Sequence, residues 1–236
     1  LEGLGAHVRR DGRTLTVNAK EITSSVLDSV SARSLRASVL LIGSVLARTG
    51  RVTFPHPGGD VIGERPIDLF VSAFQKLGAT FSETEDTYTL SAPNGLSGGE
   101  FFFRVVTVTG TEAVMMAATL AKAPVTLKNC ALEPEVVATA EFLKSCGARI
   151  EGAGTSTIVI HPTPLTSPTK PHRIIPDRIE AASFLALGAL AAKELTVTDI
   201  EPAHLDAVIQ GLEYMGVPLS VGKDFITVRA PETLLP

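Results

Sequence analysis

A short glycine motif recurs along the chain at nearly even intervals. It reads Leu-Gly-Ala or a close variant, and its glycines are residues 5, 78, 147 and 216, so successive copies lie 73, 69 and 69 residues apart. A regular interval indicates a chain assembled from repeated structural units. Solenoid repeats usually measure about 20–50 residues, so an interval of about 70 favours globular units, with a solenoid as the alternative.

The residues around each motif predict the same set of elements. Each motif is followed by two β-rich stretches with a short turn between them, which is typical of a β-hairpin. The last three motifs are preceded by a helix that a proline opens, at Pro66, Pro134 and Pro202. Upstream again, a more apolar helix leads into a short strand, so the unit is helix, strand, helix, strand, strand. We place copies of this unit at about 36–93, 107–162 and 177–231, and the closing hairpin of an earlier copy at 5–19.

The two helices of a unit differ in their hydrophobic pattern. Residues 113–118 are apolar around the whole helix, and such a helix must be buried on every side. The helix that begins at Pro134 is amphipathic, with Val136 and Ala140 on one face and Glu141 on the other. We therefore expect the apolar helices together at the centre, with sheets and amphipathic helices outside. This is an inside-out α/β barrel of repeated units rather than a doubly wound sheet.

A proline-rich segment predicts a domain boundary. Residues 162–171 carry four prolines among threonines and serines, a composition typical of a linker. We expect one domain over residues 1–172 and the first unit of a second, similar domain over residues 173–236. The opening residues are typical of the end of a helix rather than the start of a protein, so we expect the sequence to be part of a longer chain.

Composition and charge argue against several classes of function. Lys and Arg number 21 and Asp and Glu number 25, a net charge of −4, so we expect neither nucleic acid nor an anionic membrane as a partner. The apolar stretches are too short to span a bilayer and no secretion signal opens the sequence, which favours a cytoplasmic protein. Cys130 and Cys146 have no metal-ligand spacing, and we expect two reduced, buried thiols. The oligomeric state is open.

Three segments carry groups suited to chemistry on phosphates. A loop at residues 54–66 is rich in proline and glycine and contains Asp60 and Arg65. Arg36 and Arg65 lie near the starts of predicted helices, where a bound anion would interact with the guanidinium and with free backbone N–H groups. Thr107 begins a third helix and offers a hydroxyl group. The alternatives are a solvated surface loop and an ordinary helix N-cap.

Five motifs resemble the UDP-N-acetylglucosamine 1-carboxyvinyltransferase family of enolpyruvyl transferases. In order they are Arg36-Ala37-Ser38, the run from Pro57 to Leu69, Leu77-Gly78-Ala79, the run from Glu133 to Val137, and the run from Pro176 to Glu180. The resemblance implies two similar domains with the active site between them. It also implies two small-molecule substrates, phosphoenolpyruvate and UDP-N-acetylglucosamine, and a reaction that needs no metal and no organic cofactor.

The resemblance assigns roles to individual residues. Asp60 stands where the family usually has cysteine, and it is implied to be the general acid that protonates the methylene carbon of phosphoenolpyruvate. Arg36 is implied to contact the nucleotide sugar or phosphoenolpyruvate, and Arg65 is implied to bind phosphate. The other residues implied to bind the nucleotide sugar are Pro66, Ile67, Asp68, Leu69, Val105, Val106, Thr107 and Val108.

Two alternatives remain beside an enolpyruvyl transferase of cell-wall synthesis. The family usually has lysine and glycine where this chain has Val105 and Thr109. The family's Lys-Asn pair near the N-terminus, which contacts phosphoenolpyruvate, is not among these residues. The first alternative is therefore a paralogue that binds a nucleotide sugar without catalysis. The second is the sister family, 3-phosphoshikimate 1-carboxyvinyltransferase, which shares the fold. In every case we expect residues 1–236 alone to show no turnover.

Overall fold

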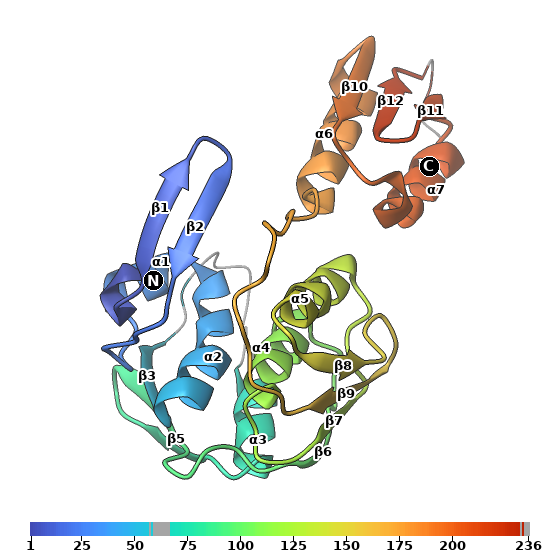
Figure 1. Cartoon of the computed structure of the whole chain (residues 1–236). Helices are drawn as coiled ribbons and strands as arrows, with labels where there is room; N and C mark the ends of the chain where they lie inside the picture. Colours follow the sequence, from blue (N-terminus) through green and yellow to red (C-terminus); the bar gives the residue numbers. More distant parts are fainter. Residues whose placement is uncertain (57, 59–66, 232, 234–236) are drawn as a thin grey trace. The chain divides into compact units, whose positions relative to one another are not determined.

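The computed structural model describes residues 1–56, 58, 67–231 and 233. The chain divides into two compact units, Leu1–His172 and Arg173–Pro236 (Figure 1). Each unit has a hydrophobic core of its own.

The first compact unit contains two full copies of the predicted repeat. One copy consists of α2 (Leu40–Thr49), β3 (Arg51–Pro55), α3 (Asp68–Lys76), β4 (Thr80–Glu83) and β5 (Thr87–Ser91). The other consists of α4 (Val108–Ala118), β7 (Val125–Lys128), α5 (Pro134–Ser145), β8 (Arg149–Glu151) and β9 (Thr157–His161). A short 3-10 helix, η1 (Glu2–Leu4), precedes the hairpin β1 (His7–Asp11) and β2 (Thr14–Asn18). The predicted order of elements is confirmed in both copies.

The second compact unit repeats the same order. It consists of α6 (Arg178–Ala191), β10 (Glu194–Thr198), the 3-10 helix η3 (Pro202–His204), α7 (Asp206–Tyr214), β11 (Leu219–Val221) and β12 (Phe225–Arg229). The three copies also share one sheet topology, with strand orders β3-β5-β4, β7-β9-β8 and β10-β12-β11. In each copy the strand before the second helix pairs antiparallel with the last strand of the hairpin.

The glycine of the repeated motif has a conformational reason. Gly5, Gly78, Gly147 and Gly216 have φ angles of 99°, 95°, 94° and 78°, which lie in the left-handed region that L-residues with a Cβ rarely adopt. Each follows a helix and turns the chain toward the next strand, as a glycine after a helix C-terminus commonly does. The even spacing in the sequence therefore reflects a turn that each unit makes in the same way.

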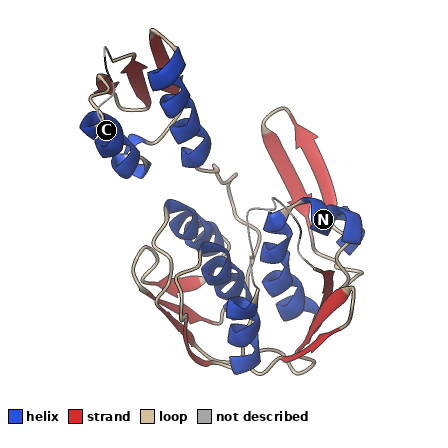
Figure 2. Ribbon diagram, turned by 180° about the vertical axis from the view of Figure 1, so that it is seen from behind, coloured by secondary structure: helices blue, strands red, loops and turns tan. Residues whose placement is uncertain are grey.

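Helix α4 lies at the centre of the first compact unit. It packs against α2, α3 and α5, and its residues Ala113, Val114, Met115, Ala117 and Ala118 are fully buried. Figures 1 and 2 show the helices between the sheet β3-β5-β4 and the sheet that contains β7, β8 and β9, so that these two sheets lie on the outside. The prediction of apolar helices at the centre with sheets around them is confirmed for this unit.

Helix α6 differs from α4 although its sequence is as apolar. Its buried residues are Ala181, Leu185, Gly188 and Ala189. On other sides Leu187 is 54% and Leu190 71% exposed. The expectation that every such helix is buried all round is therefore wrong for α6, because the elements of its own unit cover one face only.

Several smaller predictions need correction. Pro202 opens the 3-10 helix η3, and α7 begins after it at Asp206. Helix α4 ends at Ala118, ahead of the Leu-Ala pair at 120–121. A strand that the repeat does not predict, β6 (Gly99–Phe102), pairs parallel with β7. Pro66 lies outside the described residues.

In the part of the chain that the structure describes, no helix is both long enough and apolar enough to cross a bilayer.

Gly43 sets the distance between α2 and α4. A Cβ atom at this position would lie 2.1 Å from the carbonyl oxygen of Ala113, so Gly43→Ala forces the two backbones apart. We expect Gly43→Ala to lower the free energy of unfolding by about 1–3 kcal/mol, the usual range for an overpacked core. Urea unfolding of the full-length gene product measures this change.

Gly211→Ala is the matched control. Gly211 lies in α7, and a Cβ atom there would have no heavy atom within 4 Å, so alanine should stabilise that helix by about 0.5–1 kcal/mol. If Gly43→Ala leaves stability unchanged, the close approach of α2 and α4 is not essential to the core.

Glu112 is a buried carboxyl group on α4. Its side chain accepts a hydrogen bond of 3.1 Å from Thr139 Oγ1. Burial raises the pKa of Glu112, the hydrogen bond from Thr139 partly opposes this, and the negative charges of Glu135 and Glu133 raise the pKa further. The folded protein therefore binds the Glu112 proton more tightly than the unfolded chain, and this contribution to stability is lost as the pH rises through the raised pKa.

Replacing Glu112 by glutamine should thus stabilise the protein at neutral pH. The gain should vanish as the pH falls below 4.5, the ordinary pKa of glutamate, because both side chains are then neutral. Urea unfolding at pH 4 and pH 7 tests this, with Glu85→Gln on the surface as the control. A Glu112→Gln protein that is less stable at pH 7 than at pH 4, relative to the unmodified protein, would contradict the buried charge.

Candidate functional site

Three of the predicted site segments lie around α4. Arg36 is the first residue of the 3-10 helix η2 (Arg36–Val39), which packs against α4. Asp68 is the first residue of α3, which also packs against α4. Residues 105–107 lead directly into α4. The central apolar helix thus brings together segments that are far apart in the sequence.

An ion pair joins two of these segments. Arg104 Nη2 donates a hydrogen bond to Asp68 Oδ2 and forms a salt bridge with it. Arg104 precedes the predicted segment 105–108, and Asp68 belongs to the predicted segment 67–69. The two side chains are 69% and 47% exposed, so both remain accessible to a ligand. The structure therefore places the two predicted nucleotide-sugar segments side by side.

The residues after Arg104 combine exposed apolar groups with a helix cap. Val105 and Val106 are 56% and 51% exposed. Thr107 is the N-cap of α4, and its Oγ1 accepts a hydrogen bond of 3.2 Å from the N–H of Gly110. The N-cap alternative for Thr107 is therefore confirmed. Its hydroxyl oxygen already has a partner within the helix, as expected for such a cap.

Arg36 lies at the junction of two short helices. The preceding helix α1 (Ser29–Ser34) is capped by the Asp28 carboxylate, which accepts from Ser31 N–H at 2.8 Å. These hydrogen bonds from Ser31 lower the pKa of Asp28. Ser38 Oγ donates to the Ala32 carbonyl at 3.0 Å and ties the two helices together. Arg36 itself is half-buried, so its side chain is held close to the protein body.

The predicted general acid lies in the loop between β3 and α3. Asp60, Arg65 and Pro66 lie outside the described residues. At the start of the loop, the ring of His56 stacks on Tyr88 with ring centroids 4.3 Å apart. A Cβ atom on Gly58 would lie 1.6 Å from the Arg33 carbonyl oxygen. No side chain fits at Gly58, so the chain passes against the backbone of α1 at this point.

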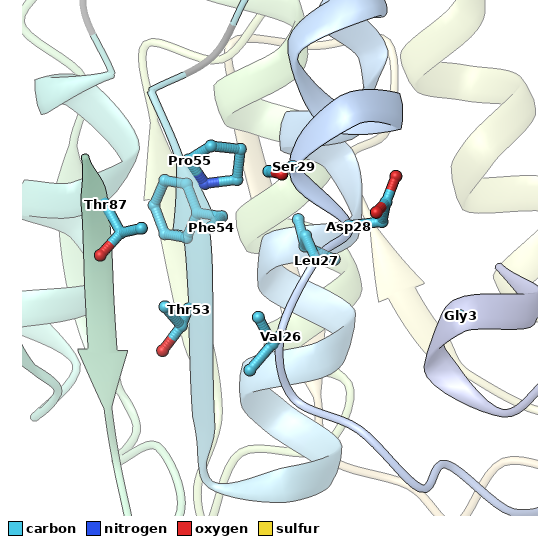
Figure 3. A pocket seen from close by; sticks show the side chains of 9 residues that line it. All are labelled: Gly3, Val26, Leu27, Asp28, Ser29, Thr53, Phe54, Pro55 and Thr87. Carbon is cyan, nitrogen blue, oxygen red and sulfur yellow. The ribbon is translucent and has the colours of Figure 1, made fainter.

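A pocket of about 400 Å³ lies beside this end of β3 (Figure 3). Figure 3 shows Phe54, Pro55 and Thr87 on one side and Val26 and Leu27 on the other. Its carboxylate, Asp28, is already used to cap α1. None of the described site residues that were predicted from the sequence lines this pocket. It is therefore separate from the candidate site formed by residues 67–69 and 104–108.

Metal and thiol chemistry have no centre in the described residues. No group of three or more His, Cys, Asp or Glu side chains lies close enough there to hold a metal ion. Cys130 and Cys146 are free and buried, as predicted. Burial raises the pKa of the Cys130 thiol to about 11, which removes its reactive thiolate form at neutral pH.

Sequence reasoning did not select Arg104. It lies one position before the predicted segment, and the pattern around it is Phe-Phe-Phe-Arg-Val-Val. A single arginine between apolar residues was a usable signal, because a charge in such a run must reach solvent or a partner. Its partner Asp68, however, is 36 residues away, and only the fold brings the two together.

Comparisons with known proteins identify the family and the fold. The model of the family described as EPSP synthase (3-phosphoshikimate 1-carboxyvinyltransferase) matches residues 1–235. The chain belongs to the EPSP synthase family. A similar solved structure, the enolpyruvyl transferase NikO from Streptomyces tendae, has a TM-score of 0.82 and 23% identity over 100% of this chain and 57% of its own. An EPSP synthase from Acinetobacter baumannii has a TM-score of 0.68 and 16% identity, over 99% of this chain and 55% of its own. The predicted enolpyruvyl transferase-like fold is confirmed.

Several relatives of this chain are named UDP-N-acetylglucosamine 1-carboxyvinyltransferase. A UDP-N-acetylglucosamine 1-carboxyvinyltransferase from a Nitratiruptor species is 40% identical over 100% of this chain and 56% of its own length. One from Solibacter usitatus is 43% identical over 99% of this chain and 55% of its own length. The chain therefore spans about half the length of the curated relatives that it matches.

The buried thiol gives a direct test of how tightly the core is closed. With a pKa of about 11 rather than 9.0, Cys130 has about a hundredfold less thiolate at neutral pH than an ordinary thiol. We expect iodoacetamide at pH 7.5 to label Cys130 in the native protein at least a hundredfold more slowly than in urea, as measured by peptide mass spectrometry. Rapid labelling of native Cys130 would mean that the core around β7 and β9 opens readily.

Proposed function

We propose that the protein transfers the enolpyruvyl group of phosphoenolpyruvate to the 3′-hydroxyl of UDP-N-acetylglucosamine and releases phosphate. This reaction opens the synthesis of peptidoglycan precursors. It places the protein in the cytoplasm and makes it a contributor to cell-wall biogenesis, and through the wall to cell shape and division. The observation that carries the proposal is the identity of about 40% over the whole chain to enzymes named for this reaction.

The geometry of the described residues supports this proposal. The Arg104–Asp68 pair joins the two segments that the resemblance assigns to the nucleotide sugar. Exposed valines at 105 and 106 lie next to this pair and provide apolar contact area. Arg36, near the start of α2, adds a cation close to α4, where an anionic substrate group needs one.

The residues outside the described ranges complete the proposed chemistry. Asp60 protonates the methylene carbon of phosphoenolpyruvate, which makes the neighbouring carbon electrophilic. The 3′-hydroxyl of the sugar attacks that carbon, and the resulting tetrahedral intermediate expels phosphate and loses a proton. Arg65 binds the phosphate, and Pro66 lines the uridine together with the described residues Ile67, Asp68 and Leu69. Arginine is suited to this work because it stays charged and binds phosphate through two N–H groups.

The choice of acceptor tests the proposal against its two alternatives. The full-length gene product is supplied with phosphoenolpyruvate and either UDP-N-acetylglucosamine or 3-phosphoshikimate, and phosphate release is measured. We expect release with the nucleotide sugar only. Release with 3-phosphoshikimate only would assign the activity that the family's description names. Binding of the nucleotide sugar without any release would identify the non-catalytic paralogue, which the departure at Val105 favours.

A substitution of Asp60 should lower the rate of catalysis without weakening the binding of the nucleotide sugar. Asp60→Ala removes the proton donor but leaves the contacts to the nucleotide sugar, so we expect kcat to fall at least a hundredfold, the usual scale for a general acid. The dissociation constant of UDP-N-acetylglucosamine, measured by calorimetry, should change less than threefold. Asp86→Ala is the control, since that aspartate is exposed on the β4–β5 turn. Phosphate release at the unmodified rate from Asp60→Ala would place the acid elsewhere.

A further inference from the structure

We propose that Asn129 and Thr111 are positioning residues, which hold the two ends of segment 104–106 in the shape that binds the nucleotide sugar. This inference rests on the proposed function, because that function makes the segment part of the substrate site. Neither residue belongs to the sequence motifs of the resemblance, and neither is among the residues assigned to a substrate. Both act through the backbone of the segment and not by contact with the substrate.

Segment 104–106 is an exposed connection between β6 and α4. The side chain of Arg104 is 69% exposed, and Val105 and Val106 are 56% and 51% exposed. On either side of the segment, Phe103 is fully buried and Thr107 caps α4. Solvent surrounds the residues between these two points, so packing does not set their conformation. Their shape therefore depends on how firmly the two ends are held.

Asn129 fixes the first end. Its Nδ2 donates a hydrogen bond of 2.8 Å to the carbonyl oxygen of Phe103. The N–H of Phe103 in turn donates to the carbonyl oxygen of Lys128 at 3.0 Å. A carbonyl oxygen only accepts, so the amide nitrogen of Asn129 is the atom that faces it. Both backbone polar groups of Phe103 are thus bound to the end of β7.

The turn at Asn129 does not by itself require an amide. Asn129 directly follows β7 and Asp199 directly follows β10, and both have a φ of 57°. Asparagine and aspartate both tolerate this left-handed conformation, but only asparagine has an N–H donor. The described sheet of the second unit, β10-β12-β11, has no strand in the place of β6. The donor is therefore present in the copy that has a segment to hold.

Thr111 fixes the second end. It is fully buried on the otherwise apolar helix α4. Its Oγ1 donates a hydrogen bond of 2.7 Å to the carbonyl oxygen of Thr107 and accepts one of 3.2 Å from the N–H of Ala131. A single hydroxyl group thus joins the start of α4 to the residues that follow Asn129. The connection after β7 therefore holds both ends of segment 104–106.

A segment held in this way is ready to bind before the ligand arrives. If one end is released, the segment takes up other conformations, and the apparent affinity falls in proportion to the fraction that is still competent. Once the nucleotide sugar is bound, its own contacts hold the segment. Loss of an anchor should therefore weaken the binding of the nucleotide sugar and leave the rate at saturation unchanged.

Asn129→Gly tests the first anchor, because glycine adopts the left-handed conformation and lacks the amide. The full-length gene product is used, and calorimetry and steady-state kinetics are measured below the unfolding midpoint. We expect Kd and KM for UDP-N-acetylglucosamine to rise about 3-fold to 10-fold, the effect of one neutral hydrogen bond. Both kcat and KM for phosphoenolpyruvate should stay within twofold. Asp199→Gly is the matched control, since it makes the same change at the same φ, and it should alter none of these values.

Thr111→Val and Thr111→Ser test the second anchor. Valine has the shape of threonine but no hydroxyl group, so we expect Thr111→Val to raise Kd and KM for the nucleotide sugar by a similar factor. Serine keeps the hydroxyl group, so Thr111→Ser should bind within twofold of the unmodified protein. The serine variant also keeps the test informative if valine, which leaves the buried N–H of Ala131 without its partner, prevents folding. Weak binding by Thr111→Ser in the folded protein would show that the hydroxyl group is not the anchor.

The remaining outcomes separate the inference from the proposed function. If Asn129→Gly lowers the unfolding midpoint but binds the nucleotide sugar as the unmodified protein does, Asn129 is only structural and the inference fails. If kcat falls while affinity is kept, the inference also fails. A protein without enolpyruvyl transfer whose affinity for the nucleotide sugar drops in Asn129→Gly, and not in Asp199→Gly, contradicts the proposed function and upholds the inference. An unmodified protein that does not bind the nucleotide sugar would overturn both.

Discussion

The close packing of α2 against α4 is the contact on which the first compact unit depends. Gly43 lets the two helices approach until a Cβ atom would nearly touch the Ala113 carbonyl. This approach buries α4, which in turn provides the surface for α3, α5 and η2. The two sheets then cover the outer faces of the helices. The site segments meet where they do because each is attached to a helix that packs on α4.

Much of this fold could be predicted from the sequence because its hairpins and turns are specified by residues that are close together in the chain. The hairpins β4–β5 and β8–β9 follow Gly78 and Gly147 as predicted, since alternating residues and turn glycines specify a hairpin without help from distant parts of the chain. The edge strand β6 could not be predicted in this way. It has no hairpin partner and exists because Gly99–Phe102 lies beside β7 in the folded unit.

The candidate site shows the same division between local and distant information. The helix starts near Arg36 and at Thr107 were visible as sequence patterns, and so was the alternative of an N-cap at Thr107. The contact between Arg104 and Asp68 was not, because nothing in either segment specifies the other. A salt bridge between exposed side chains also leaves no hydrophobic pattern. Site residues of this type are found only when the packing of the backbone is known.

Asp60 lies in the sequence between β3 and α3, a junction that is shorter in the other copies of the repeat. Asn129 follows β7 and Asp199 follows β10, both with a φ of 57°, a left-handed conformation that asparagine and aspartate tolerate better than other side chains. Twelve residues, 56–67, separate β3 from α3, whereas five, 129–133, separate β7 from α5. The proposed acid thus belongs to an insertion. In this architecture the proposed acid is an addition to a repeat that folds without it in the other copies, so a change in this segment need not rebuild the scaffold.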